Sequence, residues 1–262
     1  MRFFLTFILA CHCLSVSAET ITIAVASNFR SVMNQLINEF EAESGHEVLV
    51  TYGSSGRFFA QINNGAPFDA FFSADQEMPA LLEAEDQEQG KEDGEGEESE
   101  EENRTTRSFT YAIGALALWS KSPGLPLANG ELLRQGGFNK LSIANPRLAP
   151  YGVAAVEVLA ALGLTESTRE RWVQGENITQ TFQFVDSGNA ELGFVALSQI
   201  MRNGDIVGGS AWLVPSELHS PIRQDALLLR RGIDKQAARD FMDFVRGDKA
   251  RMIIQSYGYR FD

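Results

Sequence analysis

The sequence predicts an α/β fold made of two successive units, each a mainly parallel sheet flanked by helices. Strand and helix patterns alternate as β-α-β-α-β over residues 20–73, an order that favours parallel strands with right-handed crossovers. Similar alternation resumes after residue 109. The length of 262 residues and the hydrophobic content of 44% are sufficient for two cores of modest size.

The elements of the first unit follow from local patterns. Its expected strands cover residues 20–26, 47–52 and 69–73. Between the first two strands, apolar residues recur at spacings of three and four over residues 29–40, which predicts a helix that ends at Gly45. A shorter helix is expected around residues 58–62, after the second strand.

The second unit and the C-terminus continue the alternation. We expect strands at residues 109–119, 140–144, 191–195, 211–214 and 225–229. We expect helices at residues 153–162, 179–187, 235–246 and 248–256. The last two helices follow the final strand, so they must pack against a sheet formed earlier in the chain.

Residues 1–18 predict an export signal that is cleaved near Ala18. Its apolar stretch, residues 3–16, is too short to span a bilayer comfortably, and small residues precede the expected cleavage site. Both cysteines, Cys11 and Cys13, lie in this segment, so the mature chain would contain no thiol. We therefore expect a periplasmic protein. Anchoring as a lipoprotein at Cys11 is the alternative.

The formal net charge of −13 is concentrated in one short run. Residues 83–102 hold twelve acidic residues and one basic residue, which leaves only −2 for the rest of the chain. The composition of this run predicts a disordered acidic insertion at about residues 83–104. Because no basic stripe is visible, nucleic acid is not expected as a partner. A separate role for the run, in binding calcium or a basic surface, is an alternative.

Patterns typical of enzymes are missing from the sequence. The mature chain has two histidines, His46 and His219, and both are predicted to lie on the surface. There is no nucleophile elbow, phosphate-binding loop, dinucleotide fingerprint or zinc-ligand cluster. We therefore expect no catalytic residues, no cofactor and no metal site. A hydrolase or transferase on an α/β scaffold is the alternative.

Four loops share a design in which a strand or turn ends, small or amide-bearing residues follow, and a helix begins. These loops are residues 27–28, 54–56, 150–152 and 177–179. Ordinary helix capping explains each loop taken singly. In parallel sheets, however, such loops gather at the carboxyl ends of the strands, where ligands bind. Two loops from each unit would surround a small anion with backbone N–H groups and helix N-termini.

At these residues the sequence resembles the periplasmic molybdate-binding proteins of ABC transporters. The resemblance covers nearly all of the mature chain apart from the acidic run. The matching stretches are residues 21–29, 52–76, 141–163, 191–199 and 255–259. The string G-A-P-x-D-x-F-x-S-A-D-Q, at residues 65–76, is the most specific piece.

The resemblance implies the type II periplasmic-binding-protein fold, in which crossover strands join two α/β lobes and an oxyanion occupies the cleft. Lobe I would hold residues 19–107 and 231–262, including the acidic insertion, and lobe II would hold residues 108–230. The implied oxyanion-binding residues are Ser27, Asn28, Ser55, Tyr151 and Ile178. We expect Tyr151 to contribute its hydroxyl, and Ile178 its backbone N–H. Asp69 and Asp75 are interpreted as strand-end and capping residues.

The implied function is that of a monomeric solute-binding protein that captures molybdate, and tungstate, and delivers it to the membrane permease of an ABC transporter. A rigid ring of donors spaced for these anions leaves gaps around the smaller sulfate. Each buried donor left unpaired costs about 1–3 kcal/mol. A receptor of the same fold for sulfate, phosphate or another small anion is the alternative.

Overall fold

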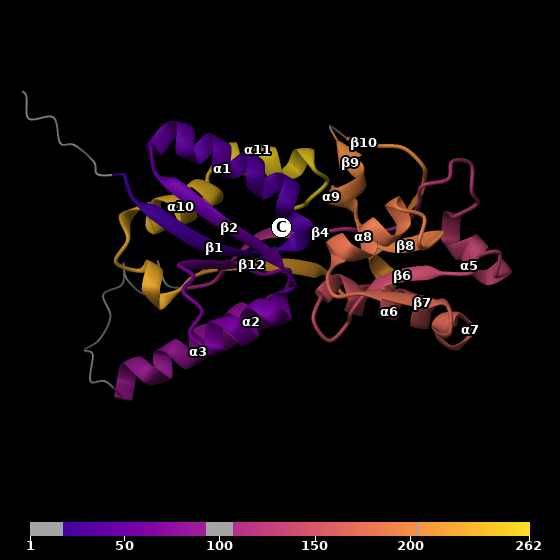
Figure 1. Cartoon of the computed structure of the whole chain (residues 1–262), viewed down its shortest axis with the longest axis horizontal. Coiled ribbons are helices and arrows are strands. Elements are labelled where there is room, and N and C mark those ends of the chain that lie inside the picture. The colour runs from indigo at the N-terminus through magenta and orange to yellow at the C-terminus, as the bar shows by residue number, and fades with distance from the viewer. Residues whose placement is uncertain (1–17, 93–106, 203) are drawn as a thin grey trace, which may run out of the picture.

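The computed structural model describes residues 18–92, 107–202 and 204–262. Figure 1 shows two lobes side by side, each built around one five-stranded sheet, so the expected two-lobed α/β fold is confirmed. The predicted export signal, with Cys11, lies outside the described residues except for Ala18, and its cleavage stays a prediction. Among the described residues, no helix combines the length and the apolar character needed to cross a bilayer.

The first sheet has the strand order β2-β1-β3-β12-β4. Its strands are β1 (Thr20–Ala26), β2 (Glu47–Gly53), β3 (Ala70–Phe72), β4 (Phe109–Gly114) and β12 (Ile222–Leu228). Strand β1 pairs in parallel with β2 and β3, as predicted, and β12 runs antiparallel to β3 and β4. The carboxyl ends of β1, β2 and β3 therefore share one edge of the sheet.

Helices cover both faces of the first sheet (Figure 1). They are α1 (Arg30–Ser44), α2 (Ser55–Asn63), α3 (Glu77–Glu92), α10 (Gln236–Arg246) and α11 (Asp248–Ser256). The alternation along β1 separates two cores: Ile23 packs with residues of α1 and α10, whereas Ala24 packs with residues of α2 and α3. Helix α1 ends where predicted, because Gly45 adopts a φ of 73° that a residue with a side chain rarely takes.

The second sheet has the order β11-β5-β8-β6-β7. Its strands are β5 (Leu116–Ser120), β6 (Leu141–Ala144), β7 (Trp172–Gly175), β8 (Leu192–Ala196) and β11 (Ser210–Leu213). Its helices are α5 (Glu131–Gln135), α6 (Pro150–Ala161), α7 (Thr165–Arg169), α8 (Ile178–Asp186) and α9 (Leu197–Ile200). Strand β6 is parallel to β7 and β8, and β5 is antiparallel to β8 and β11.

Short elements complete the chain. A two-stranded ribbon consists of β9 (Met201–Arg202) and β10 (Asp205–Ile206), paired antiparallel. The 3-10 turns are η1 (Ser27–Phe29), η2 (Ala128–Gly130), η3 (Ser216–Leu218) and η4 (Arg230–Gly232). Of these, η1 directly follows β1, so the first of the four predicted loops is a tight turn that leads into α1.

The passage between the lobes differs from the sequence expectation. The predicted strand over residues 109–119 is two strands, β4 and β5, which pair in different sheets on either side of Ala115. The expected boundaries, after residue 107 and before residue 231, put β4 and β12 in lobe II, whereas both strands pair in the first sheet. Hydrophobic periodicity cannot mark the change from one sheet to the other, because residues on both sides of Ala115 are buried.

The first part of the predicted disordered insertion is helical instead. Helix α3 continues to Glu92, and the Glu83 carboxylate accepts hydrogen bonds from the backbone N and the hydroxyl of Ser108, at 3.1 and 2.8 Å. Alanine, leucine, glutamate and glutamine are good helix formers, so they extend α3 into the acidic run. The rest of the expected insertion, residues 93–104, lies outside the described residues.

His46 is another correction, because it is buried and not on the surface. Only 4% of the residue is exposed, and its Nδ1 accepts a hydrogen bond from the backbone N of Glu19 at 3.1 Å. The imidazole also stacks near the ring of Phe40. His46 therefore fixes the start of the first strand on α1 and takes no part in a cleft.

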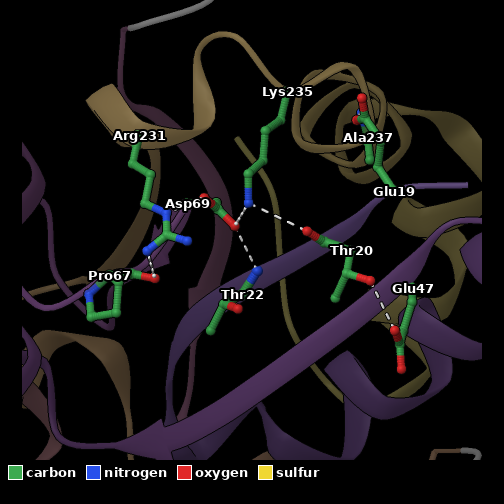
Figure 2. A network of polar contacts seen from close by, with 9 residues as sticks. All are labelled: Glu19, Thr20, Thr22, Glu47, Pro67, Asp69, Arg231, Lys235 and Ala237. Atoms are coloured by element: carbon green, nitrogen blue, oxygen red, sulfur yellow. Dashed lines mark hydrogen bonds and ion pairs between the residues drawn. The ribbon is translucent and has the colours of Figure 1, made fainter.

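A polar network joins the first strands to the C-terminal helices (Figure 2). Asp69, which precedes β3, is fully buried. One carboxylate oxygen accepts hydrogen bonds from the backbone N of Thr22, at 2.8 Å, and from Nζ of Lys235, at 2.7 Å. The other oxygen lies 3.3 Å from Nε of Arg231. Asp69 therefore stands at the start of β3 with its carboxylate committed to structural contacts.

Candidate functional site

A small cavity lies between the lobes at the carboxyl ends of the first parallel strands. Its volume is about 10 Å³. It is lined by Ala26, Ser27, Asn28, Gly53, Ser54, Ser55, Ala74, Ala149, Pro150, Tyr151, Asn177 and Ile178. The structure thus brings together all five residues that the resemblance implies, and parts of all four predicted loops meet there.

The first lobe presents a hydroxyl whose proton has no acceptor among the described residues. Ser55 is the first residue of α2, and its side chain lies at the lobe interface with only 1% of the residue exposed. Its Oγ accepts a hydrogen bond from the backbone N of Ala74 at 2.9 Å. Because one lone pair of the hydroxyl is occupied in this way, its O–H can donate to a ligand.

The second lobe presents two helix N-termini. In α8 the side-chain oxygen of Asn177 caps the helix by accepting from the backbone N of Thr179 and Gln180, both at 3.0 Å. The Asn177 side chain does not accept from the N–H of Ile178, which has no hydrogen-bond partner among the described residues. In α6, Pro150 occupies the first turn and the N–H of Tyr151 is similarly unpaired within the described part of the chain. Both N–H groups therefore suit an anion.

The hydroxyl of Tyr151 is used differently from the expectation. It accepts a hydrogen bond at 3.1 Å from Nε2 of Gln224, on β12, and lies against Gly114, the last residue of β4. Neither of these neighbours lines the cavity. The hydroxyl is thus directed into the passage between the lobes, and the backbone N–H is the group that Tyr151 leaves available for a ligand.

Asn28 is held from several segments at once. Its Nδ2 donates to Oε1 of Gln224 at 2.8 Å and to the hydroxyl of Tyr259 at 2.9 Å. Its backbone oxygen accepts from the hydroxyls of Ser198, at 2.9 Å, and Tyr259, at 3.0 Å. Sequence reasoning missed Ser198 and Gln224 because buried polar residues in apolar strands and helices carry no pattern. Ser198 and Tyr259 both lie in stretches that the family resemblance covers, residues 191–199 and 255–259.

Direct contacts hold the lobes against each other around the cavity. The hydroxyl of Thr179 donates to the backbone oxygen of Ser27 at 3.2 Å, and Ser27 Oγ donates to Asn177 Oδ1 at 3.3 Å. The backbone N of Gly56 donates to the oxygen of Leu148 at 3.0 Å. The described lobes are therefore closed on each other.

The cavity lining is electrically neutral. None of its residues is Lys, Arg, Asp or Glu. Arg57 follows Ser55 closely, but its guanidinium forms an exposed ion pair with Glu176 across the lobes at 3.1 Å. Asp75 lines a neighbouring groove, and its carboxylate caps α3 by accepting from the backbone N of Met78 at 2.9 Å. Burial raises the pKa of this carboxyl.

No metal centre is visible in residues 18–92, 107–202 and 204–262, where acidic, histidine and cysteine side chains do not gather in groups of three or more. The chemistry that the cavity offers is therefore hydrogen-bond donation from backbone N–H groups and serine hydroxyls. Donors of this kind stabilise a small anion.

Three buried tyrosines beside the cavity predict alkaline unfolding. Burial raises the pKa of Tyr259 to about 12, and it raises the pKa values of Tyr111 and Tyr151 well above their ordinary 10.0. The unfolded chain binds fewer protons than the folded chain once the pH exceeds 10.0. The contribution of these tyrosines to the free energy of unfolding should therefore be constant below pH 10 and fall between pH 10 and 12.

Urea unfolding at stepped pH values, followed by circular dichroism, measures this effect. A free energy of unfolding that stays level from pH 10 to 12 would contradict it. So would a spectroscopic titration in which all five tyrosines of the chain ionise near pH 10 while the protein stays folded.

Comparison with known proteins agrees with this geometry. Residues 21–260 match a family model described as bacterial extracellular solute-binding protein. Molybdate-binding protein ModA of Azotobacter vinelandii is 46% identical over 252 residues, which cover 96% of this chain and 93% of that protein. Its counterpart in Rhodobacter capsulatus is 38% identical over 248 residues, 94% and 90% of the two chains.

A solved structure is similar along nearly its whole length. The periplasmic molybdate-binding protein of Azotobacter vinelandii gives a TM-score of 0.82 at 38% sequence identity. The match covers 92% of this chain and 99% of that chain. Similarity at this level extends over both lobes and over the loops between them.

Proposed function

The chain belongs to the family of bacterial extracellular solute-binding proteins, among the molybdate-binding members, and from this premise we propose that it captures molybdate in the interlobe cavity. It then delivers the anion to the membrane permease of an ABC transporter. The protein acts as a periplasmic monomer after removal of residues 1–18. Ser27, Asn28, Ser55, Tyr151 and Ile178 hold the oxyanion.

The observation that carries this proposal is the pair of unpaired N–H groups at the N-termini of α6 and α8. They belong to Tyr151 and Ile178 and meet the free hydroxyl proton of Ser55 across a cavity with no charged lining residue. Helix N-termini disperse negative charge through the peptide dipoles. A dianion can therefore be held without a lysine or arginine, and Tyr151 contributes its backbone N–H in place of its hydroxyl.

Selectivity follows from the donor-only lining. A protonated phosphate requires an acceptor, and in the lining the oxygens of Ser55 and Asn177 already accept hydrogen bonds from backbone N–H groups. The smaller sulfate would leave part of the donors unpaired, at about 1–3 kcal/mol each. Tungstate carries the same charge and shape as molybdate and should bind comparably. Closure occurs by rotation of the lobes about the two passages, near Ala115 and between β11 and β12.

Calorimetric titration of the mature protein with molybdate, tungstate, sulfate and phosphate tests the proposal. Molybdate and tungstate should bind with clearly higher affinity than sulfate, and phosphate should bind weakest. Equal affinities for sulfate and molybdate would overturn molybdate capture in favour of a general oxyanion receptor.

Substitution of Ser55 tests the donor directly. Ser55→Ala should weaken molybdate binding by about 1–3 kcal/mol, because a hydroxyl that donates to a charged ligand is lost. Ser256→Ala is the matched control, since the exposed Ser256 hydroxyl only contacts the backbone oxygen of Ile253 on its own helix. Calorimetry should find wild-type affinity in the control. Wild-type affinity in Ser55→Ala would exclude the hydroxyl as a ligand.

A further inference from the structure

Gln224 is a fully buried amide on the strand that returns from lobe II to lobe I. Strand β12 pairs with β3 and β4, and its register with β4 shifts between Gln224 and Asp225. Such a bulge redirects a side chain at the cost of regular pairing, and bulges recur beside functional sites. The side chain of Gln224 is accordingly aimed at the region behind the cavity.

The amide of Gln224 joins ligand-binding loops of both lobes. Its Oε1 accepts from Nδ2 of Asn28, in lobe I, at 2.8 Å and from the hydroxyl of Tyr111, on β4, at 3.1 Å. Its Nε2 donates to the hydroxyl of Tyr151, in lobe II, at 3.1 Å. Both ends of the amide are thus engaged, so its orientation is fixed by the network.

We propose that Gln224 is the positioning residue that sets the spacing between the oxyanion donors of the two lobes, and this inference rests on the proposed function. Gln224 does not line the cavity. It acts through Asn28 on the loop after β1 and through Tyr151 on the first turn of α6. When the lobes close, one rigid amide bridges the two donor loops and holds the cavity at the size of the larger tetrahedral anion.

The chemistry of the bridge makes it sensitive to substitution. Replacing this buried amide by an apolar side chain of similar length removes one hydrogen bond from each of its partners. The phenol of Tyr151 then loses the donor on β12 and keeps its hydrogen bond with Tyr259, and the amide of Asn28 loses one acceptor. Both loops stay folded, because Asn28 keeps its contacts with Tyr259 and Ser198. Their spacing then depends on the remaining contacts through Tyr259 and between Ser27 and α8, without the direct amide bridge.

A double-mutant cycle with Gln224→Met and Tyr151→Phe tests the proposal, with Gln135→Met as control. Gln135 is exposed and donates a hydrogen bond to Glu131 on its own helix. Affinities for molybdate and for sulfate are measured by calorimetry, and thermal unfolding of each ligand-free variant is recorded. Gln224→Met should bind molybdate about 10-fold more weakly. Its affinity for sulfate should change much less, so the molybdate-to-sulfate ratio should fall.

The double variant should bind no more weakly than Gln224→Met alone, since both substitutions break the same bridge. If Gln224→Met does not fold, Tyr151→Phe carries the test: it keeps the ring and the backbone N–H, and its molybdate-to-sulfate ratio should fall several-fold. An unchanged ratio overturns the inference. Two other results would also overturn it. One is an equal loss of affinity for molybdate and sulfate that parallels the loss of thermal stability, and the other is strict additivity of the affinity losses in the double-mutant cycle. A wild-type protein that binds no oxyanion would overturn the proposed function itself.

Discussion

Replacing Lys235 with methionine is expected to lower the free energy of unfolding by about 3–5 kcal/mol. The ammonium group lies 2.7 Å from the carboxylate of Asp69, which is fully buried. Without Lys235 the carboxylate would keep two partners. One is the backbone N–H of Thr22, and the other is the half-exposed Arg231 side chain, whose Nε lies 3.3 Å from a carboxylate oxygen. Removing one partner of a buried ion pair leaves a charge that neither water nor a full partner compensates.

The network in Figure 2 explains why the effect should reach the whole lobe. Asp69 stands before β3, Thr22 lies in β1, and Lys235 caps the approach to α10, so one carboxylate holds together segments separated by more than half of the chain. Lys235 also donates to the backbone oxygen of Thr20 at 3.3 Å. Methionine matches the length of lysine but supplies none of these contacts.

Lys249→Met is the matched control, because Lys249 contacts Glu39 and Glu43 on the surface, where ion pairs contribute little. Urea unfolding followed by circular dichroism measures both variants. The pair Asp69→Leu and Lys235→Met together should recover part of the loss, since no buried charge then remains. Equal stability of Lys235→Met and Lys249→Met would show that the buried pair does not hold the lobe.

Much of the first lobe could be predicted from the sequence because its signals are local. The apolar spacing from residue 29 to residue 40 gives α1, and Gly45 ends it at a backbone conformation suited to glycine. The parallel pairing of β1 with β2 and β3 follows from the helices between them. Such features depend on neighbours along the chain, and the sequence displays them directly.

The passages between the lobes could not be predicted because they depend on distant partners. Residues 109–119 are mostly apolar, and only pairing with β12 on one side and β8 on the other divides them into β4 and β5. From the sequence, His46 is predicted to be a surface residue in a turn, and only its contacts with Glu19 and Phe40 in the folded chain show that it is buried. Tertiary contacts determine which side chains are buried at these positions, and hydrophobic periodicity along the sequence does not predict such contacts.

The candidate site shows the same division. The four loops were recognisable as helix starts, and Ser27, Ser55 and Ile178 line the cavity where these starts converge. The family resemblance, rather than any pattern, singled out the particular residues. The direction of the Tyr151 hydroxyl was missed because it depends on Gln224, which lies 73 positions further along the chain.

Gly114→Ala should weaken molybdate binding by about 5- to 150-fold, which corresponds to 1–3 kcal/mol of strain in the closed form. A Cβ on Gly114 would lie 2.2 Å from the hydroxyl of Tyr151 and 2.6 Å from Nε2 of Gln224. These distances are too short for any contact. Gly114 is the last residue of β4, in lobe I, whereas Tyr151 begins α6 of lobe II.

The clash with Tyr151 therefore exists only while the lobes are closed, and its cost falls on the binding-competent state. The clash with Gln224, on the neighbouring strand of the same sheet, is present in both states and does not change the affinity. Gly137→Ala is the control, because its Cβ would meet only the flexible end of Leu132, at 3.1 Å, far from the lobe interface. Calorimetry gives the affinities, and small-angle X-ray scattering reports whether the ligand-free variant is more open. Wild-type affinity in Gly114→Ala would mean that Tyr151 can leave this position while the anion stays bound, and that closure does not depend on the contact between β4 and α6.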